Sequence, residues 1–200
     1  MFENEQNYEI KMGYSTVLVN TGKIARQASG SVMITCGKTT ILATATRSKD
    51  VKEGQDFFPL TVDYIEKFYA SGKFPGGFIK RESKPSTEEI LISRLVDRPI
   101  RPLFPEGFLN AVHVVLNVVS FDGVNMPENL ATLGASMALS LSDIPFNGPV
   151  AGVTVGYVND EYVLNPTKEQ QENSKIYLSV AGTKDAITMV EAWSNEVSEE

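Results

Sequence analysis

The sequence predicts an α+β fold in which a mixed β-sheet packs against helices, rather than a doubly wound sheet. Three observations support this class: short strand patterns fill the first 65 residues, the two strongest helix patterns come later, and strand patterns resume towards the end. Of the 200 residues, 42% are hydrophobic and 22% are charged, which is enough apolar material for one sizeable core. Because no run of about 18 apolar residues occurs, no membrane span is expected.

The N-terminal part of the chain carries short runs of β-branched residues. They predict strands over residues 9–12, 16–19, 31–35 and 40–46. Cys36-Gly37-Lys38 separates the last two runs, so these strands are expected to form a hairpin. Another strand is expected over 57–64, with Pro59 near its start or at a sheet edge.

The middle of the chain predicts a loop, a helix, a strand and a second helix. Residues 69–78 are rich in Gly and Pro, which is typical of a loop. Ser86-Thr87-Glu88-Glu89 is a capping box, and the helix that it begins is expected to end near Arg98, because Pro99 follows. The nearly continuous apolar run 112–121 predicts a strand buried on both faces. Residues 128–141 have the Ala, Leu and Met content of a buried helix.

The C-terminal part predicts four more strands and the start of a helix. The strands are expected over 150–158, 162–164, 176–180 and 186–192. Ser194 is an N-cap candidate, and the acidic residues after it suit a helix N-terminus. We therefore expect residues 1–200 to be one domain truncated near a C-terminal helix, in a longer protein. A flexible acidic tail is the alternative.

The distribution of charge is uneven. The net charge is −7, but residues 1–101 carry 15 Lys and Arg against 12 Asp and Glu, whereas the remainder carries three lysines against 13 acids. Eight cations lie between residues 67 and 101: Lys67, Lys73, Lys80, Arg81, Lys84, Arg94, Arg98 and Arg101. A basic strip on an acidic protein indicates a local anionic partner. A solvated face is the alternative.

Most catalytic and metal-binding signatures are missing from the sequence. Cys36 and His113 are the only residues of their kinds, which excludes a disulfide framework, a cysteine-built zinc site and most nucleophile triads. His113 lies in an apolar run and is expected to be a core or sheet-surface histidine rather than a catalytic base. The cysteine content and the acidic N-terminus, which has no apolar signal region, predict a cytoplasmic protein.

Two motifs in the basic strip point to nucleic acid. The first, Gly76-Gly77-Phe78-Ile79-Lys80-Arg81 with Lys84, combines a pliable backbone, a stacking ring and cations, which suits single-stranded RNA or DNA. In the second, Arg94 and Arg98 stand one helical turn apart, with Arg101 beyond. They form either a phosphate clamp or structural pairs with Asp97, Glu88 and Glu89.

Longer stretches around these motifs closely resemble the bacterial polynucleotide phosphorylase family. The first two stretches are Gly72-Lys73-Phe74-Pro75-Gly76-Gly77-Phe78-Ile79-Lys80-Arg81-Glu82 and Arg94-Leu95-Val96-Asp97-Arg98-Pro99-Ile100-Arg101-Pro102-Leu103-Phe104-Pro105. Phe57-Phe58-Pro59-Leu60-Thr61-Val62-Asp63-Tyr64 and Gly148-Pro149-Val150-Ala151-Gly152 fit the same family. The match runs from about Tyr8 to Glu200. It implies the first of two RNase PH-like cores, with β-α-β-α architecture.

The resemblance implies an activity and partners. Enzymes of this family degrade single-stranded RNA, including mRNA, from the 3′ end, with phosphate as the attacking group and Mg²⁺ as cofactor, and they release nucleoside diphosphates. They are homotrimers with a central pore for RNA, and partnership with other RNA-degrading proteins is expected. The family usually has Phe-Phe-Arg-Arg at the pore constriction, where this chain has Phe78, Ile79, Lys80 and Arg81. Ile79 removes a ring and Lys80 loses the planar fork of arginine, so a looser grip is expected.

The same resemblance implies that this core does not carry the chemistry. The positions that hold metal-binding carboxylates in the catalytic core correspond here to Gln171, Tyr177 and Ser179, before Val180-Ala181-Gly182. The serine-rich phosphate pocket corresponds to Met126-Pro127-Glu128, where a carboxylate would repel phosphate. We therefore expect no catalytic residue and no metal site in residues 1–200. RNA contacts are expected from Phe78, Ile79, Lys80, Arg81, Lys84, Arg94, Arg98 and Arg101.

Two alternatives remain open at this point. One is a stand-alone, non-enzymatic RNA-binding module on the same fold, which the length of the natural gene would distinguish. The other is a single-core exonuclease, which needs a local carboxylate pair. Asp160-Glu161 is the nearest candidate for that pair, although a turn between strands is the more ordinary interpretation of these two residues.

Overall fold

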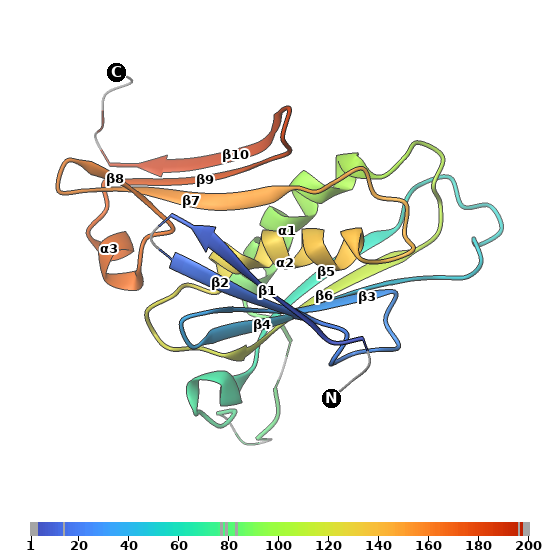
Figure 1. Cartoon of the computed structure of the whole chain (residues 1–200), viewed down its shortest axis with the longest axis horizontal. Coiled ribbons are helices and arrows are strands. Elements are labelled where there is room, and N and C mark those ends of the chain that lie inside the picture. Colours follow the sequence, from blue (N-terminus) through green and yellow to red (C-terminus); the bar gives the residue numbers. More distant parts are fainter. Residues whose placement is uncertain are drawn as a thin grey trace.

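The chain folds into two β-sheets with the two long helices between them (Figure 1). This computed structural model describes residues 4–13, 15–76, 78, 80–82, 84–195 and 197. One core runs through the molecule: it joins buried residues of the larger sheet, both helices and the smaller sheet. The α+β class with a mixed sheet packed on helices, expected from the sequence, is confirmed.

The larger sheet has six strands in the order β1-β2-β3-β4-β6-β5. Their bounds are β1 Gln6–Met12, β2 Ser15–Thr21, β3 Gly30–Cys36, β4 Thr39–Arg47, β5 Leu60–Glu66 and β6 Val112–Ser120. All neighbours are antiparallel except β5 and β6, which are parallel. The hairpin expected between β3 and β4 is present, and Gly37 adopts the left-handed conformation (φ +60°) that its turn requires.

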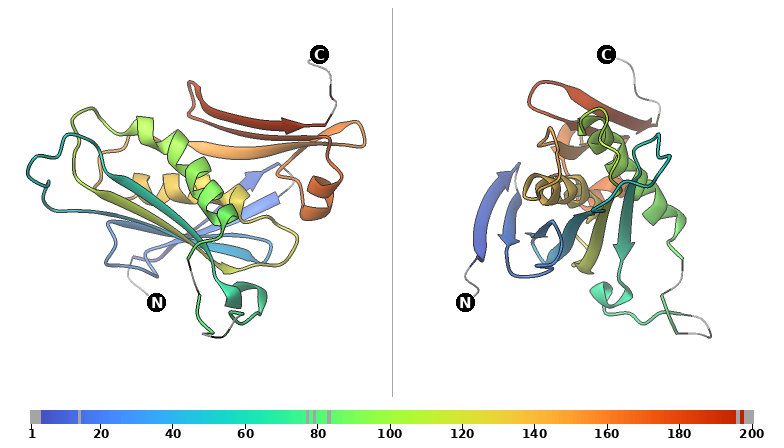
Figure 2. Two further views of the ribbon diagram at one scale, coloured as in Figure 1. Left: turned by 180° about the vertical axis from the view of Figure 1, so that it is seen from behind. Right: turned by 90° about the vertical axis from the view of Figure 1, so that its right-hand side faces the viewer.

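Strand β6 is not buried on both faces, so that expectation is wrong. Val112, Val114, Leu116 and Val118 are buried, whereas His113 is exposed and the residues after it on the same face are half-buried. The reason is that α1 and α2 cover only one face of this sheet (Figure 2). The apolar residues of the other face line a surface rather than a second core layer.

Helix α1 (Thr87–Ile100) begins at the capping box and passes through its proline. The Ser86 hydroxyl accepts from the Glu89 N–H at 3.1 Å, and the Glu89 carboxylate accepts from the Ser86 N–H at 2.6 Å, as expected. The end expected near Arg98 is wrong, because Pro99 lies inside the helix and a 3₁₀ turn, η2 (Arg101–Leu103), follows. In the last turn a proline removes only one helical hydrogen bond, and its ring is buried in the core here.

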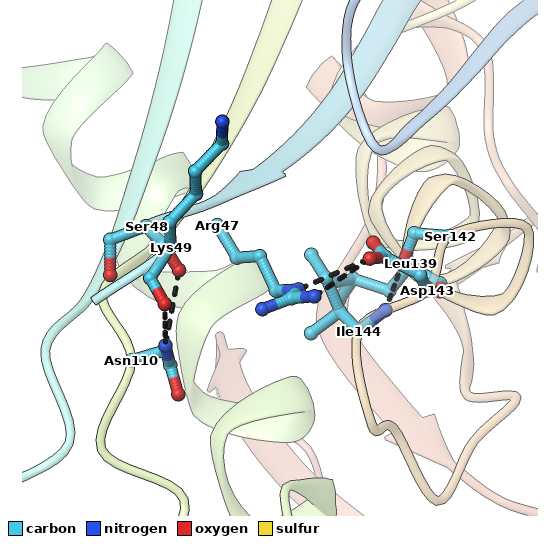
Figure 3. Close-up of polar contacts among 8 residues, drawn as sticks. All are labelled: Arg47, Ser48, Lys49, Asn110, Leu139, Ser142, Asp143 and Ile144. Atoms are coloured by element: carbon cyan, nitrogen blue, oxygen red, sulfur yellow. Dashed lines mark hydrogen bonds and ion pairs between the residues drawn. The ribbon is translucent and has the colours of Figure 1, made fainter. Parts of the chain in front are cut away.

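Helix α2 (Glu128–Ser140) is buried and packs on β3 and β4, as its composition predicts. Gly30 of β3 lies so close to α2 that a Cβ there would meet the Ala138 carbonyl oxygen. Beyond the helix, Asp143 accepts from Arg47 Nη2 at 2.9 Å (Figure 3). The Asn110 amide donates to the Ser48 and Lys49 carbonyls in the same view. These contacts fasten the end of β4 to the segments that follow α2 and precede β6.

The smaller sheet is antiparallel, in the order β10-β9-β7-β8. Its strands are β7 Ala151–Val158, β8 Glu161–Leu164, β9 Ile176–Gly182 and β10 Ile187–Ser194, and a short helix not predicted from the sequence, α3 (Lys168–Glu172), precedes β9. Ser194 ends β10 instead of capping a helix. The rest of the expected helix start falls on Asn195 and Val197, which have no helical structure, and on residues outside the described ones.

The two faces of the smaller sheet differ in what covers them. Ala181 and Met189 are buried on the face towards α2, where a Cβ on Gly152 would meet Thr132. The register places apolar rows on the other face: Val153, Val180 and Val190 in one, and Val155, Leu164, Leu178 and Ala192 in the next. No described helix packs on this outer face (Figure 1). Within the described residues, no helix is both long enough and apolar enough to cross a membrane.

Candidate nucleic-acid interface

Residues 67–86 connect β5 to α1, and the described residues of this segment (67–76, 78, 80–82 and 84–86) project from the body of the molecule (Figures 1 and 2). We call it the basic excursion, because five of the eight cations of the strip lie in it. It begins with a 3₁₀ turn, η1 (Phe68–Ser71), and is fastened at its far end by Glu82. The Glu82 carboxylate accepts from Lys67 Nζ at 2.7 Å and from the Phe68 N–H at 3.2 Å. The bond from Lys67 lowers the pKa of Glu82.

The described residues of the predicted RNA-binding loop are all at the surface. Phe78 is 102% exposed, a value that only a fully solvated ring reaches, and Lys80, Arg81 and Lys84 are exposed too. Lys80 has a positive φ of 54°, which turns the chain sharply between the ring and Arg81. The predicted contact Ile79 lies outside the described residues.

Two further aromatic residues of the basic excursion were missed by sequence reasoning. Phe74 is 91% exposed and Tyr69 is 61% exposed. Water-facing aromatic rings beside cations form the kind of surface on which single-stranded bases stack. Their exposure could have been predicted from the sequence, because an aromatic ring inside a Gly- and Pro-rich loop has no helix or strand to bury it.

The three arginines of the second motif have different environments. Arg101 donates to both carboxylate oxygens of Asp97, at 2.9 and 2.6 Å, and also to the Phe58 and Leu60 carbonyls. Arg98 pairs with Glu191 of β10 at 2.7 Å, and both side chains are about half exposed. Arg94 is exposed and forms no ion pair with any described residue. Arg94 is therefore the most available for a ligand, whereas Arg101 has a structural task.

The region that the sequence resemblance aligns with a phosphate pocket is acidic. Glu128, the first residue of α2, is mostly buried, and burial with the nearby charges of Glu66 and Glu88 raises its pKa to about 7. Burial and then the charge of Glu128 raise the pKa of Tyr177, so Tyr177 of β9 lies within electrostatic range of this carboxylate. An ionised carboxylate at this place disfavours an incoming phosphate.

The residues present do not fit a catalytic Mg²⁺ site. Tyr177 and Ser179 lie on β9 and Gln171 lies on α3, and none of the three offers the carboxylate oxygens that Mg²⁺ prefers. Within the described ranges, no group of three His, Cys, Asp or Glu side chains has a metal-binding arrangement. No catalytic step is therefore assigned to a metal in this chain.

The remaining candidates from the sequence have ordinary structural surroundings. His113 lies on the open face of the larger sheet, with Nε2 2.7 Å from Asp63 Oδ2. Cys36 is buried, and desolvation raises the pKa of its thiol. Asp160, with φ +62°, forms the turn between β7 and β8, and Glu161 is the first residue of β8. This placement favours the interpretation of Asp160 and Glu161 as a turn between strands.

The fold and sequence match a known class of nucleases. The model of the 3′ exoribonuclease family, domain 1, matches residues 14–145, and that of domain 2 of the same family matches residues 148–200. This chain belongs to the 3′ exoribonuclease family. A solved structure described as the *Archaeoglobus fulgidus* exosome with RNA bound to the active site has a similar fold, with a TM-score of 0.70 and 20% sequence identity. The match covers 96% of this chain and 81% of that one.

Within this family, the sequence is similar to polyribonucleotide nucleotidyltransferases, another name for polynucleotide phosphorylases. Those of *Bacillus cereus* (strain AH187) and *Bacillus anthracis* (strain CDC 684 / NRRL 3495) are each 56% identical over 200 residues. The match covers 100% of this chain and 28% of each relative. The resemblance inferred from the motifs is thereby confirmed, and the chain spans little more than a quarter of the length of these relatives.

Proposed function

We propose that this chain is the first RNase PH-like core of a phosphate-dependent 3′→5′ exoribonuclease, a polyribonucleotide nucleotidyltransferase that degrades single-stranded RNA and mRNA. In this reaction a phosphate oxygen attacks the phosphorus of the last phosphodiester. The bond from phosphorus to the 3′ oxygen breaks, a nucleoside diphosphate leaves, and the shortened strand keeps a 3′ hydroxyl. The role proposed for residues 1–200 is to bind and guide the RNA and to support a homotrimer.

The basic excursion is the observation that carries this proposal. Its three exposed rings lie among cations along a projecting segment. The rings are Tyr69, Phe74 and Phe78, and the cations are Lys73, Lys80 and Arg81. Stacking on an aromatic ring accepts any base, and cations beside the rings bind the phosphates between bases. Such a surface suits an enzyme that must hold RNA of any sequence.

The chemistry is assigned to another part of the parent enzyme, where Mg²⁺ and phosphate would act together. Two observations support this. Gln171, Tyr177 and Ser179 offer no carboxylate to a metal, and the Glu128 carboxylate disfavours phosphate. Single-stranded RNA, phosphate and Mg²⁺ mixed with this chain should release no nucleoside diphosphate while circular dichroism shows the chain folded. Release of product would show that residues 1–200 contain a catalytic site.

A longer parent also agrees with the outer face of the smaller sheet. Its rows of Val, Leu and Ala would be unusual as a permanent surface of a soluble protein, which favours further chain or a neighbouring subunit against it. We place the parent enzyme in the cytoplasm, as a homotrimer that works with other RNA-degrading proteins. Analytical ultracentrifugation of the full-length protein tests the trimer.

The RNA-guiding role predicts a change in salt dependence. In Lys80→Ala with Arg81→Ala, the slope of log affinity for a single-stranded RNA against log salt should fall by about 1 to 1.5, because two phosphate contacts release fewer counterions. The matched control is Lys49→Ala with Lys52→Ala, which removes the same charge from the loop between β4 and β5. Equal slopes in both double variants and the unmodified chain would show that the RNA does not contact the basic excursion at Lys80 and Arg81.

The alternative of a stand-alone RNA-binding module shares the basic excursion but not the chemistry. It predicts that the full-length protein binds RNA without phosphate-dependent degradation. The 56% identity to polyribonucleotide nucleotidyltransferases favours the enzyme. Phosphorolysis by the full-length protein distinguishes the two.

A further inference from the structure

A cleft of about 590 Å³ lies at the base of the basic excursion. Residues from the end of β5 and from β6 line one side, Phe121 lies just beyond β6, and Ser86 and Pro127 bring the starts of α1 and α2 to it. Among the described strands, β5 and β6 are the only parallel neighbours. The carboxyl ends of parallel strands, where helices begin, are a frequent location for ligand sites.

The walls of this cleft combine charged and polar side chains with an apolar part that includes aromatic rings. Phe68 of η1 is 40% exposed, and Phe121 is half-buried. Pro85 and Pro127 add two rigid rings to the lining. A flat ring entering here would replace water against apolar surface, which is the favourable part of base binding.

The acidic groups of the cleft already have partners, whereas Lys73 at its rim does not form an ion pair with a described residue. The acidic groups are largely satisfied: Glu82 pairs with Lys67, and the Glu89 carboxylate accepts from the Glu66 and Ser86 N–H groups. Tyr64 donates to Glu66 at 2.8 Å, and desolvation raises the pKa of Glu66. Lys73 lines the cleft, is exposed, and forms no ion pair with a described residue.

We propose that this cleft binds one nucleotide of the RNA strand that crosses the basic excursion. The base packs against Phe68 and Phe121, Glu66 accepts from the N–H groups of its edge, and Lys73 binds the phosphate at the rim. This proposal rests on the RNA-guiding role proposed above. It differs from the contacts expected of residues 78–81, because none of these residues lines the cleft.

The first test is the affinity of this chain for a fluorescein-labelled single-stranded RNA. Phe68→Ala with Lys73→Ala should weaken binding at least about fivefold, since one stacked base and one phosphate contact are lost. Ser71→Trp, which adds bulk at the cleft wall without truncating it, should give a loss in the same direction. The matched control, Tyr162→Ala with Lys175→Ala, removes an exposed ring from β8 and an exposed lysine just before β9, and it should leave affinity unchanged. Circular dichroism confirms that each variant is folded.

Cross-linking locates the nucleotide directly. RNA that carries 4-thiouridine should cross-link within residues 67–73 or 118–127 on irradiation. Cross-links confined to residues 74–84, with unchanged affinity in Phe68→Ala with Lys73→Ala, would overturn the proposal.

Two further outcomes separate this proposal from the proposed function. If Lys80→Ala with Arg81→Ala weakens RNA binding and the cleft variants do not, the cleft proposal fails and the RNA-guiding role stands. If no variant of either set weakens RNA binding, both fail. AMP binding that the cleft variants reduce, with RNA binding unaffected, would assign the cleft to a free nucleotide and also overturn the proposal.

Discussion

Glu128 makes the stability of this chain dependent on pH. Its carboxyl group is mostly buried at the start of α2, near Glu66 and Glu88, and has no cationic partner among the described residues. Burial first, and then these like charges, raise its pKa from 4.5 to about 7. Replacement of Glu128 by Gln removes the charge while keeping the size of the side chain.

The sign of the effect follows from proton binding. Between pH 4.5 and about 7 the folded chain keeps the Glu128 proton and the unfolded chain releases it, so the free energy of unfolding decreases as pH rises through this range. Above about pH 7 Glu128 is ionised in both the folded and the unfolded chain, and the free energy of unfolding decreases no further. At about 1.4 kcal/mol for each pH unit, the total decrease in the free energy of unfolding across this range is about 3 kcal/mol.

The assay is urea unfolding followed by circular dichroism at pH 5 and pH 8. Glu128→Gln should have nearly the stability of the unmodified chain at pH 5 and exceed it by up to about 3 kcal/mol at pH 8. The control is Glu106→Gln, at an exposed turn, for which the difference should be small at both values. A stability difference for Glu128→Gln that is the same at both pH values, or a loss at pH 8, would refute the reasoning.

Two other substitutions test packing and pairing. Gly30→Ala should lower the free energy of unfolding by about 2 to 3 kcal/mol, because the new Cβ meets the Ala138 carbonyl oxygen of α2, whereas Gly76→Ala, in open space, should change it little. Equal effects at both glycines in urea titrations would contradict the close packing of β3 on α2. Arg101→Ala should lower the free energy of unfolding by about 1 to 2 kcal/mol, since the two hydrogen bonds to Asp97 and two carbonyl contacts are lost. Arg98→Ala should lower it by less than about 1 kcal/mol, because its ion pair with Glu191 is exposed. The reverse order would mean that Arg98 has the larger structural role.

Local signals in the sequence determined much of this fold. The capping box at Ser86, the hairpin turn at Gly37 and the apolar helix pattern of α2 each depend on neighbours within a few residues, and each was predicted correctly. Residues 69–78, the first part of the basic excursion, were predicted as a loop for the same reason, since Gly and Pro act on their own backbone. The family resemblance, carried by long runs of residues, was likewise available without coordinates.

Tertiary contacts decided the points at which the local patterns were ambiguous or misleading. Pro99 stays in α1 because the core accepts its ring, and β6 has one buried face because helices cover only one side of its sheet. Arg94 and Arg101 are alike in the sequence, yet only Arg101 meets a carboxylate and two carbonyls. Those carbonyls belong to residues more than 40 positions away in the chain.

The cleft below the basic excursion has the same origin. Its walls come from β5, η1, the start of α1, β6 and the segment before α2, which are brought together only by the parallel pairing of β5 with β6. The sequence by itself therefore determined most of the elements, the family and the place of the basic strip in the chain. Which cations are committed to structure, and where a nucleotide can enter, were decided by the tertiary structure, because both depend on contacts between residues far apart in the chain.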